Sequence, residues 1–408
     1  MKKPIEKPKK LLFITWDSDR THYLEGLFFP ILEGIQKQED WDCHVLQFSW
    51  AGQEKVLHLA RQAEKAGLVY RHYPISRKPH KMLGALWAIL KGVRYLKNYI
   101  LEQDVQLLMP RSTMPAMMVN GLLKRLKVPI KVIFDADGLA LEERVDFAGL
   151  NDQGLQYKWL KKEELKMLKR ADLVLTRSQK AIEVHMENLA PRNHAKFHVV
   201  SNGRDPEVFR TNLIQRDRIR KKYGLEAKDQ LLVYVGTLGP QYGWEEMLAI
   251  FKAYRQDHLQ SKMMVISKNL EFLEGKVPAE LSDKLILISL SFQEIPEYLS
   301  AGDMALNLRL PAPSMRGVAP IKLGEYLLMG LPVISSRGIG DTAAILEGKP
   351  FVHLFDHGDP NRIDKTKTWI KSQINPDREA IRSFALSHFT LEKSIADYGL
   401  ALEKLYGR

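Results

Sequence analysis

Residues 289–336 read SLSFQEIPEYLSAGDMALNLRLPAPSMRGVAPIKLGEYLLMGLPVISS and decide the fold of the chain. The apolar runs at 304–308 and 331–334 predict two buried strands. A loop at 311–320 with three prolines and a glycine lies between them, and residues 321–328 follow it with the spacing of a helix. A strand, a loop, a helix and a second strand together predict one repeat of an α/β domain with a parallel sheet.

The two ends of this helix carry the residues that favour them. Pro320 suits a helix start, because its fixed φ is already helical and its missing N–H would be unpaired there. Gly330 is expected to end the helix. The start of a helix behind a glycine-bearing loop favours anions, because unpaired N–H groups and the positive end of the helix dipole face the loop. We therefore expect Lys322 to meet a phosphate and Glu325 to meet a hydroxyl.

The motif Pro-x-Lys-Leu-Gly-Glu-Tyr-Leu at 320–327, followed by Gly-x-Pro-Val-Ile at 330–334, resembles the donor-site signature of the family 4 retaining glycosyltransferases. These enzymes have the GT-B fold, an α/β fold of two Rossmann-like, doubly wound domains facing a cleft. The resemblance implies that Glu325 holds the ribose of a nucleotide-sugar donor. The alternative interpretation is a Rossmann-like unit in which the helix only packs on its sheet.

A second strand, glycine loop and helix stand earlier in the same half of the chain. An apolar strand at 231–235 runs into Gly236-Thr237-Leu238-Gly239, and a helical pattern begins near residue 244. The chain departs here from the commonest pattern of the family it resembles. Thr237 and Tyr242 stand where an arginine and a lysine usually contact the donor diphosphate, and Gly317 stands where a first glutamate is usual. The charge for the diphosphate must then come from other residues.

The predicted donor-binding residues combine both loops with the cations and backbone N–H groups near the helix start. They are Gly236, Thr237, Leu238, Gly239, Tyr242, Arg309, Ser314, Arg316, Gly317, Val318, Ala319, Pro320, Ile321, Lys322 and Glu325. We predict catalytic roles for Asp137, Lys322 and Glu325. No metal or other cofactor is expected, because cations and a helix N-terminus can neutralise the phosphates.

The composition limits the number of domains and the class of protein that the chain can form. The 408 residues are enough for two to three domains, and 45% hydrophobic and 27% charged residues are ordinary for a globular protein. The single cysteine, Cys43, allows no intrachain disulfide, and no apolar run reaches the roughly 18 residues that span a bilayer. The basic N-terminus meets a strand without a signal-peptide core, so we expect a cytoplasmic protein, for which a peripheral position at the inner face of the membrane stays open.

A net charge of +12 favours an anionic partner: a nucleic acid, an anionic membrane or a phosphorylated substrate. The sequence has no aromatic-basic nucleic-acid motif, so we expect no nucleic acid. Residues 77–99 form a basic helical pattern with leucines at helical spacing. This pattern fits either a helix lying on anionic lipid or an ordinary outer helix packed by its leucine face.

The first half of the chain alternates strands and helices. Apolar strands are expected at 11–16, 41–48 and 69–73, which predicts a parallel, doubly wound sheet with ligands beyond the carboxyl ends of its strands. We place the first domain at 1–205, completed by a crossing helix at 387–408, and the nucleotide-sugar-binding domain at 206–386.

The first domain is expected to bind the acceptor. After a strand at 131–134 comes Asp135-Ala136-Asp137-Gly138, for which three interpretations compete: an acceptor site, a cap for a helix at 139–145, and a site for Mn²⁺ or Mg²⁺. Glycosyltransferases that resemble this chain carry Asp-x-Arg-Gly here, so Ala136-Asp137 departs from that pattern. The predicted acceptor-binding residues are Asp17, Asp19, Arg20, Arg111, Asp135, Asp137 and Glu143. His185, His194 and His198 are not spaced for zinc.

The resemblance implies a retaining transfer of a sugar from a nucleotide-sugar to a hydroxyl of a lipid-linked or polysaccharide glycan. In that mechanism the departing phosphate takes the proton of the hydroxyl, so the protein mainly positions groups and stabilises charge. Two other classes stay open: a nucleotide-sugar epimerase or hydrolase on the same fold, and a non-catalytic nucleic-acid-binding or scaffold protein.

Overall fold

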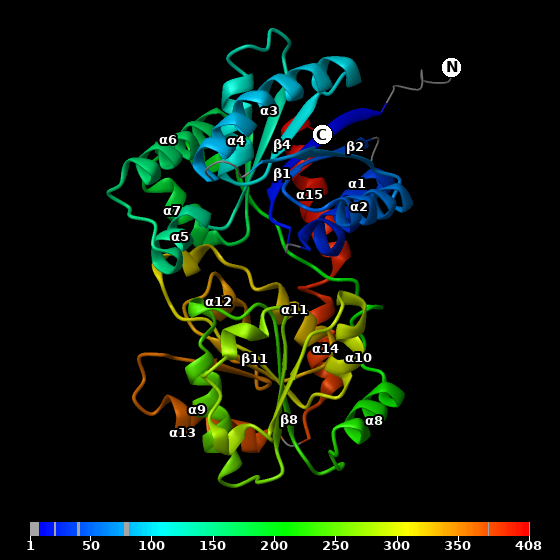
Figure 1. The fold of residues 1–408 in the computed structure, drawn as a ribbon, viewed down its shortest axis with the longest axis vertical. Helices are drawn as coiled ribbons and strands as arrows, with labels where there is room; N and C mark the ends of the chain where they lie inside the picture. Colours follow the sequence, from blue (N-terminus) through cyan, green and yellow to red (C-terminus); the bar gives the residue numbers. More distant parts are fainter. Residues whose placement is uncertain (1–7, 20–21, 39–40, 77–80, 374, 408) are drawn as a thin grey trace. The chain divides into compact units, whose positions relative to one another are not determined.

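The computed structural model describes residues 8–19, 22–38, 41–76, 81–373 and 375–407. The chain divides into two compact units (Figure 1): unit 1 consists of Met1–Ser201 and Ser394–Arg408, and unit 2 of Asn202–Lys393. Sequence analysis placed the two boundaries at 205/206 and 386/387. Within unit 2, the chain at Arg204 pairs with the segment at 389–391, because the Arg204 N–H donates to the Phe389 carbonyl and the Leu391 N–H donates to the Arg204 carbonyl.

Unit 1 is built on a parallel sheet of seven strands in the order β3-β2-β1-β4-β5-β6-β7. The strands are β1 (Lys9–Asp17), β2 (Trp41–Ser49), β3 (Val69–Pro74), β4 (Leu107–Pro110), β5 (Lys131–Asp137), β6 (Leu173–Thr176) and β7 (Phe197–Val199). The strand order reverses between β1 and β4, where Phe13 lies opposite Val45 on one side and Met109 on the other. Ligands of doubly wound sheets bind at such a reversal, beyond the carboxyl ends of the strands.

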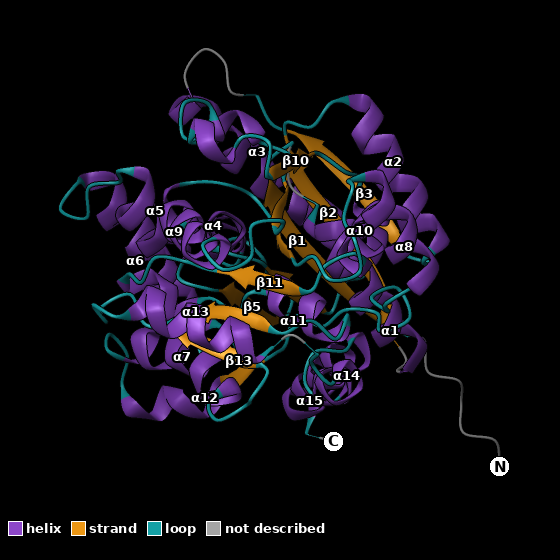
Figure 2. Cartoon of the chain, turned by 90° about the horizontal axis from the view of Figure 1, so that it is seen from below, coloured by secondary structure: helices purple, strands orange, loops and turns teal. Residues whose placement is uncertain are grey.

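Helices cover both faces of this sheet (Figure 2). Alternate strand residues such as Leu12 and Ile14 pack in one core with residues of α3 (Lys81–Gln103), α4 (Thr113–Leu122), α6 (Leu155–Arg170) and α7 (Gln179–Met186). The unit also contains the π-helical turn η1 (Leu24–Phe28), α1 (Phe29–Gln38), α2 (Gln53–Lys65), α5 (Ala140–Ala148) and α15 (Leu391–Tyr406). Helices α1 and α15 approach closely at Gly34, where a Cβ atom would lie 2.1 Å from the Ile395 side chain. A larger residue at position 34 would force the Ile395 side chain to move.

Unit 2 has a six-stranded parallel sheet in the order β10-β9-β8-β11-β12-β13. Its strands are β8 (Leu231–Val235), β9 (Lys262–Ile266), β10 (Leu285–Ile288), β11 (Met304–Asn307), β12 (Val333–Ser336) and β13 (Val352–Phe355). One core joins a sheet face to α8 (Leu213–Lys222), α10 (Ile295–Ser300), α11 (Ile321–Leu328) and α14 (Arg378–Leu386). A second core joins the opposite face to α9 (Trp244–Arg255) and α13 (Arg362–Ser372). A short helix, α12 (Thr342–Leu346), follows β12.

Several sequence-based element predictions are confirmed and one is extended. Helix α11 ends as predicted at Gly330, whose φ of +68° is the left-handed conformation that glycine adopts most easily. The Ser178 side chain caps α7 by accepting the Ala181 N–H. Strand β5 extends through Asp137, three residues beyond its expected end at Phe134. No helix in the described part of the chain has the length and apolar character needed to cross a membrane.

Candidate functional site

The strand order of unit 2 reverses between β8 and β11, and two predicted donor loops leave the sheet at this point (Figure 1). The Gly236–Gly239 loop follows β8, and Arg309 follows β11 by two residues. The sequence therefore predicted residues that the topology places at a typical ligand position of an α/β sheet.

The conformation of the first loop is fixed by a residue that sequence analysis missed. The Asn269 side chain accepts the Leu238 N–H through Oδ1 at 2.9 Å and donates to the Leu238 carbonyl through Nδ2 at 2.7 Å. The Tyr234 hydroxyl donates to the Thr237 carbonyl at 2.6 Å. Asn269 follows the apolar strand β9 by three residues, so a polar side chain near the end of a buried strand was the available signal. Because Asn269 uses the Leu238 N–H, this group is already satisfied within the protein.

Tyr242 and Arg309 meet at the carboxyl edge of the sheet. The Arg309 guanidinium lies 4.8 Å from the centroid of the Tyr242 ring, within the range of a cation–π contact. The Leu310 N–H donates to the Gln241 carbonyl at 2.9 Å, so the backbones of the two loops are also joined. Tyr242 supplies no charge, but it orients the arginine that does.

The loop before α11 contains the short turn η7 (Pro313–Gly317), in which Ser314 and Gly317 are buried and Arg316 is partly exposed. Val318 is extended, and the chain continues through Ala319 to Pro320, which is the N-cap residue of α11 and not part of its first turn. Pro320, as the N-cap residue, makes no side-chain cap hydrogen bond. The first N–H groups of α11, beginning at Ile321, are therefore placed to meet an anion.

Glu325 is the most buried ionisable group at this edge. Its side chain is fully buried, with Oε1 2.9 Å from Nε of Arg204 and Oε2 2.7 Å from Nζ of Lys322. Burial alone would raise the pKa of Glu325, but the charges of Lys322 and Arg204 outweigh it and hold the pKa below its ordinary value. Each oxygen can accept a further hydrogen bond, so a ribose hydroxyl would share Glu325 with its two cations.

Sequence analysis missed Arg204, because 121 residues separate it from Glu325 along the chain. The contact also changes the interpretation of Lys322. A lysine in the first turn is unfavourable beside the positive end of the helix dipole, which suggested a bound anion. The structure places Glu325, three residues later on the same helix, as an internal anion for Lys322.

A second charged cluster lies at the strand reversal of unit 1. Asp17 ends β1, Arg111 follows β4, and Asp135 and Asp137 end β5. The Arg111 guanidinium forms an ion pair with Asp137 and lies 5.0 Å from the Phe28 ring. Burial raises the pKa of Asp17, although the charge of Arg111 partly offsets this effect.

Arg177 and Tyr398 complete the unit 1 cluster, and sequence analysis missed both. Arg177 Nη2 lies 2.8 Å from Asp135 Oδ2 and donates to the Tyr398 hydroxyl at 3.2 Å, and Arg177 Nε lies 3.6 Å from Asp137 Oδ1. Arg177 sits one residue beyond β6, whereas Tyr398 comes from the distant helix α15. Three carboxylates thus face two guanidinium groups, and Asp137 is the most exposed of the three, with 29% of its side chain accessible.

The structure overturns one interpretation of the Asp135–Asp137 motif. The two carboxylates lie on β5, and helix α5 begins at Ala140 with Leu139 as an N-cap that makes no side-chain hydrogen bond. The cap prediction is therefore wrong, because Asp135 and Asp137 are held by arginines instead. Asp137 also adopts a left-handed φ of +60°, which is uncommon outside glycine. Such backbone conformations concentrate at functional sites.

The other predicted acceptor residues have different surroundings. Asp19 accepts a hydrogen bond from the Trp50 indole at 3.2 Å. Arg20 lies outside the described residues. Glu143 lies half-buried on α5. Within the described residues, no group of three or more His, Cys, Asp or Glu side chains could hold a metal ion.

A buried polar network lies apart from both strand reversals. Lys161 on α6 contacts Glu142 and Glu164, each at 2.6 Å. His185 on α7 is buried, and its ring stacks on Phe197 with centroids 6.2 Å apart. Burial lowers the pKa of His185 to about 4, and the charge of Lys161 acts in the same direction. His185 is therefore a neutral core residue at ordinary pH.

This burial predicts a pH dependence of stability. A His whose pKa falls on folding stabilises the protein above its unfolded pKa, near 6.5, and the stabilisation is lost as pH falls toward the folded value. We expect the His185→Leu variant to lose less unfolding free energy than the wild type between pH 7.5 and pH 5, by roughly 2 kcal/mol. Urea unfolding at both pH values measures this difference. The control His194→Leu changes an exposed histidine of the same unit and should leave the wild-type pH slope unchanged. An unchanged slope in His185→Leu would contradict the prediction.

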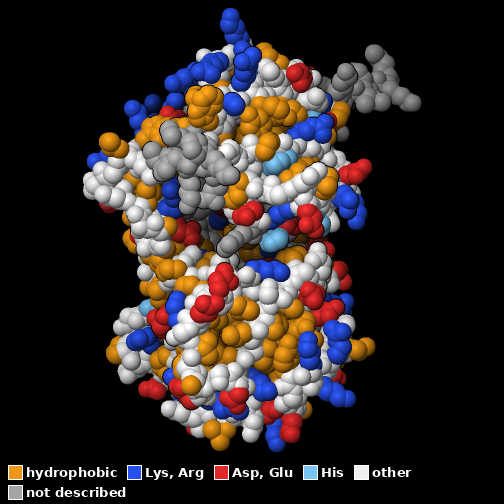
Figure 3. All heavy atoms as spheres, in the orientation of Figure 1, with side chains coloured by type: hydrophobic (Ala, Val, Ile, Leu, Met, Phe, Trp, Pro, Cys, Tyr) orange, Lys and Arg blue, Asp and Glu red, His pale blue; other side chains and the backbone are white. Residues whose placement is uncertain are grey.

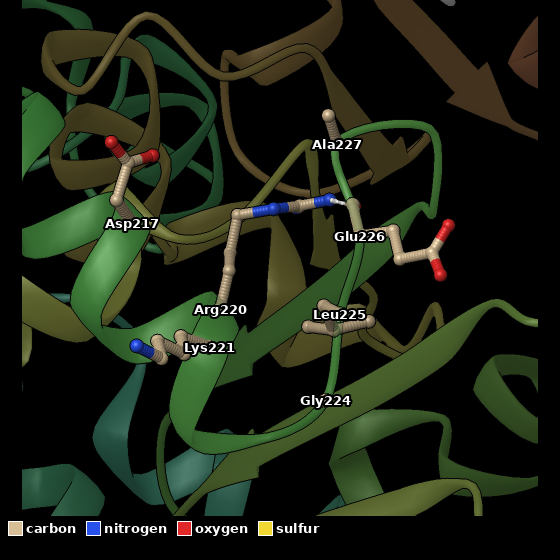
Figure 4. A pocket seen from close by; sticks show the side chains of 7 residues that line it. All are labelled: Asp217, Arg220, Lys221, Gly224, Leu225, Glu226 and Ala227. Atoms are coloured by element: carbon tan, nitrogen blue, oxygen red, sulfur yellow. Dashed lines mark hydrogen bonds between the residues drawn. The ribbon is translucent and has the colours of Figure 1, made fainter.

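A hollow of about 540 Å³ lies at the other edge of the unit 2 sheet, before β8 begins (Figure 4). It is lined by Asp217, Arg220, Lys221, Gly224, Leu225, Glu226 and Ala227. The Arg220 guanidinium binds Asp303 at 2.9 Å and the carbonyls of Ala301 and Asp229 at 3.2 and 2.7 Å. These contacts give Arg220 a structural role, and none of the predicted site residues lines the hollow.

Comparison with known proteins shows which of them this chain resembles. No known family model matches the chain. The chain is similar to TuaH of Bacillus subtilis strain 168, named as a candidate glycosyltransferase of teichuronic acid biosynthesis, with 24% identity over 209 residues. That match covers 50% of the chain and 49% of TuaH, so the chain spans about half the length of this relative.

Solved structures match over nearly the whole chain. HepE of Anabaena in complex with UDP-glucose has a TM-score of 0.70 at 14% identity, covering 98% of this chain and 100% of that one. Sucrose-phosphate synthase of Thermosynechococcus elongatus has a TM-score of 0.69 at 13% identity, covering 98% of this chain and 99% of that one. At such low identity these likenesses concern the fold alone. With the two parallel sheets, they show that the chain has the two-domain, Rossmann-like GT-B fold.

Proposed function

We propose that the chain is a glycosyltransferase that binds a nucleoside-diphosphate sugar in unit 2 and transfers the sugar to a glycan or lipid-linked acceptor bound in unit 1. The observation that carries the proposal is the arrangement at the unit 2 strand reversal. There, the cations Arg309 and Lys322 and the start of α11 accompany the buried carboxylate Glu325. The similarity to HepE, solved with UDP-glucose, and to TuaH supports this function.

Each donor group has a matching partner in this proposal. A diphosphate loses its water on binding, so it needs cations or N–H donors in exchange. Arg309, Lys322 and the N–H groups at the start of α11 would supply them. Glu325 would accept a hydrogen bond from the ribose, and its ion pairs with Arg204 and Lys322 keep it ionised and in place.

The proposed transfer retains the configuration at the sugar carbon. The bond from that carbon to the diphosphate oxygen breaks, a bond to the acceptor hydroxyl oxygen forms on the same face, and the hydroxyl proton passes to the departing phosphate. Cations beside the phosphate stabilise the charge that develops as the bond breaks. In unit 1, Asp137 and its neighbouring carboxylates would accept hydrogen bonds from acceptor hydroxyls, with Asp137 oriented by Arg111 and Arg177.

A thermal-shift screen with nucleotides and nucleotide-sugars tests the donor half, because a ligand that binds only the folded protein raises its Tm. Turnover of the best donor with and without candidate glycan acceptors then tests the reaction. Turnover that needs no acceptor would make the protein an epimerase or hydrolase. If no nucleoside diphosphate or nucleotide-sugar raises the Tm, the donor site is refuted.

We further propose that α3 holds unit 1 at an anionic membrane surface, where a lipid-linked acceptor would be found. Trp87 and Leu90 are exposed by 63% and 61%, and Lys91 and Arg94 are exposed beside them. Lys91 Nζ lies 5.2 Å from the Trp87 ring. Val93 and Ile100 of α3 face the core. The apolar residues of α3 therefore lie partly against the core and partly at the surface. Figure 3 shows Lys and Arg side chains gathered near apolar ones over the part of unit 1 that carries α3 in Figure 1.

Charge reversal tests this surface. Lys91→Glu with Arg94→Glu should weaken binding to vesicles containing anionic lipid by roughly 1 kcal/mol for each positive charge removed, and more at low salt. Cosedimentation measures the loss. Arg218→Glu with Lys221→Glu makes the same change of charge on α8 of unit 2 and should have little effect. If wild-type protein does not bind such vesicles, α3 is an ordinary outer helix.

A further inference from the structure

A chain of polar side chains runs behind the candidate donor site of unit 2. Ser336, the last residue of β12, is fully buried, and its Oγ accepts the Arg309 N–H at 2.9 Å. The same Oγ lies 2.8 Å from Nε2 of His357, and Nδ1 of His357 lies 3.8 Å from Oε1 of Glu246 in the first turn of α9. We call Ser336, His357 and Glu246 the relay.

The Ser336 hydroxyl can serve both contacts, because its oxygen has two acceptor lone pairs and one proton. One lone pair accepts the Arg309 N–H. The hydroxyl can then donate its proton to Nε2 of His357, or accept a proton from Nε2 with its second lone pair. In either arrangement Ser336 stays between Arg309 and His357.

The relay contacts the backbone of a donor loop through Ser336. Arg309 is tied through its N–H to Ser336, and the next residue, Leu310, is tied through its N–H to the Gln241 carbonyl. The Arg309 side chain in turn lies against Tyr242. The position of the guanidinium is therefore fixed from both sides of the strand reversal.

We propose that the relay is a positioning device for the diphosphate-binding Arg309. The inference rests on the proposed function, because it assigns Arg309 to the diphosphate of a nucleotide-sugar. The relay residues themselves do not contact the ligand. They act through the backbone of Arg309.

The surroundings of His357 fit this role. Its side chain is only 10% exposed and packs edge-on against Phe355, with centroids 4.9 Å apart. The charged groups acting on it are Glu246 of α9, Arg362 of α13 and the neighbouring Asp356. Burial lowers the pKa of His357, and Glu246 only partly opposes this effect. The neutral form therefore persists to a lower pH than in a free histidine, whose pKa is near 6.5.

Two measurements on the full-length chain test the proposal separately from the proposed function. The first is hydrogen exchange of the Arg309 and Leu310 amides without nucleotide. Ser336→Ala should speed exchange at Arg309, because its N–H loses its acceptor, whereas Ser335→Ala, at the next position of the same strand, should not. Unchanged exchange in Ser336→Ala would overturn the relay.

The second measurement is the Kd for UDP, GDP and ADP, each titrated alone. Ser336→Ala should raise the Kd of the nucleotide that binds by about tenfold, the size of one hydrogen bond. The same change in an Arg309→Ala background should have almost no further effect, because coupled residues are not additive. Equal effects in both backgrounds would mean that Ser336 acts without Arg309, which overturns the proposal.

The same Kd isolates His357. His357→Ala removes the side chain that contacts Ser336 Oγ and should raise the Kd, whereas His357→Gln, whose side-chain oxygen can accept the Ser336 hydroxyl proton, should restore part of the affinity. Equal Kd values for His357→Ala and the wild type would refute the role of His357. If the exchange result holds but none of the three nucleotides binds, the proposed function fails while the tie between Ser336 and Arg309 stands.

Discussion

Lys322→Ala is expected to lower kcat/KM for sugar transfer by about 10²-fold or more, the size of effect seen when one charge-stabilising donor is removed. The affinity for a nucleoside diphosphate should fall with it, whereas the affinity for the bare nucleoside should change little. The reason is that Thr237 and Tyr242 carry no charge for the diphosphate, so Lys322 and Arg309 must supply it. Loss of Lys322 also removes a partner of Glu325 Oε2 at 2.7 Å.

Lys284→Ala is a matched control for this variant. Lys284 is exposed to nearly the same extent as Lys322, 27% against 28%, and also pairs with a nearby acid, Asp283. It directly precedes β10, at the amino edge of the sheet, so its loss should not change transfer. Unchanged turnover in Lys322→Ala would move the phosphate site to Arg309 or Arg316. If none of these three cations matters, the donor-site assignment is wrong.

Glu325→Ala is expected to destabilise unit 2 by about 3–5 kcal/mol, because it leaves the buried guanidinium of Arg204 without its anion. Urea unfolding at neutral pH measures this loss. Replacing both partners with apolar residues, Arg204→Met with Glu325→Leu, should recover most of the stability. Glu325→Gln keeps the shape of the side chain and is the better variant for measuring nucleotide affinity.

The exposed ion pair between Arg218 and Glu297 provides a control for the stability loss expected of Glu325→Ala. Their side chains are 58% and 42% exposed, so Glu297→Ala should cost less than about 1 kcal/mol. A similarly small cost for Glu325→Ala would contradict the assignment of Glu325 and Arg204 as a buried pair that supports the site.

The elements with strong local patterns were predictable from the sequence. The apolar runs of β8 and β11 identify buried strands, and Gly330 marks the end of α11 because few other residues adopt a left-handed φ easily. The glycine loop after β8 and the start of α11 followed from the same rules. The spacing of hydrophobic residues and the residue types at helix ends are local properties, so a single sequence is enough to predict these elements.

The partners of the site residues were not predictable in this way. Arg204 meets Glu325 across 121 residues, and Arg177 meets Tyr398 across 221. Only the order of strands in the sheet brings together residues so far apart. Local sequence gives at most a weak signal, such as the polar residues His357 and Asn269 just beyond apolar strands. Of the three interpretations of the Asp135–Asp137 motif, the helix cap failed for the same reason, because Arg177 and Arg111 were not visible as neighbours.

The discontinuity of unit 1 has a consequence for the order in which the chain can fold during synthesis. Tyr398, which binds Arg177, and Ile395, which packs at Gly34, both belong to α15 and emerge from the ribosome after all of unit 2. Unit 2 is one continuous segment and can fold as soon as it is complete. The nascent unit 1 must wait with the face of α1 uncovered and Arg177 without its tyrosine. Its last helix is thus a late step of biogenesis, and during that interval the exposed apolar face of α1 is a natural substrate for chaperones.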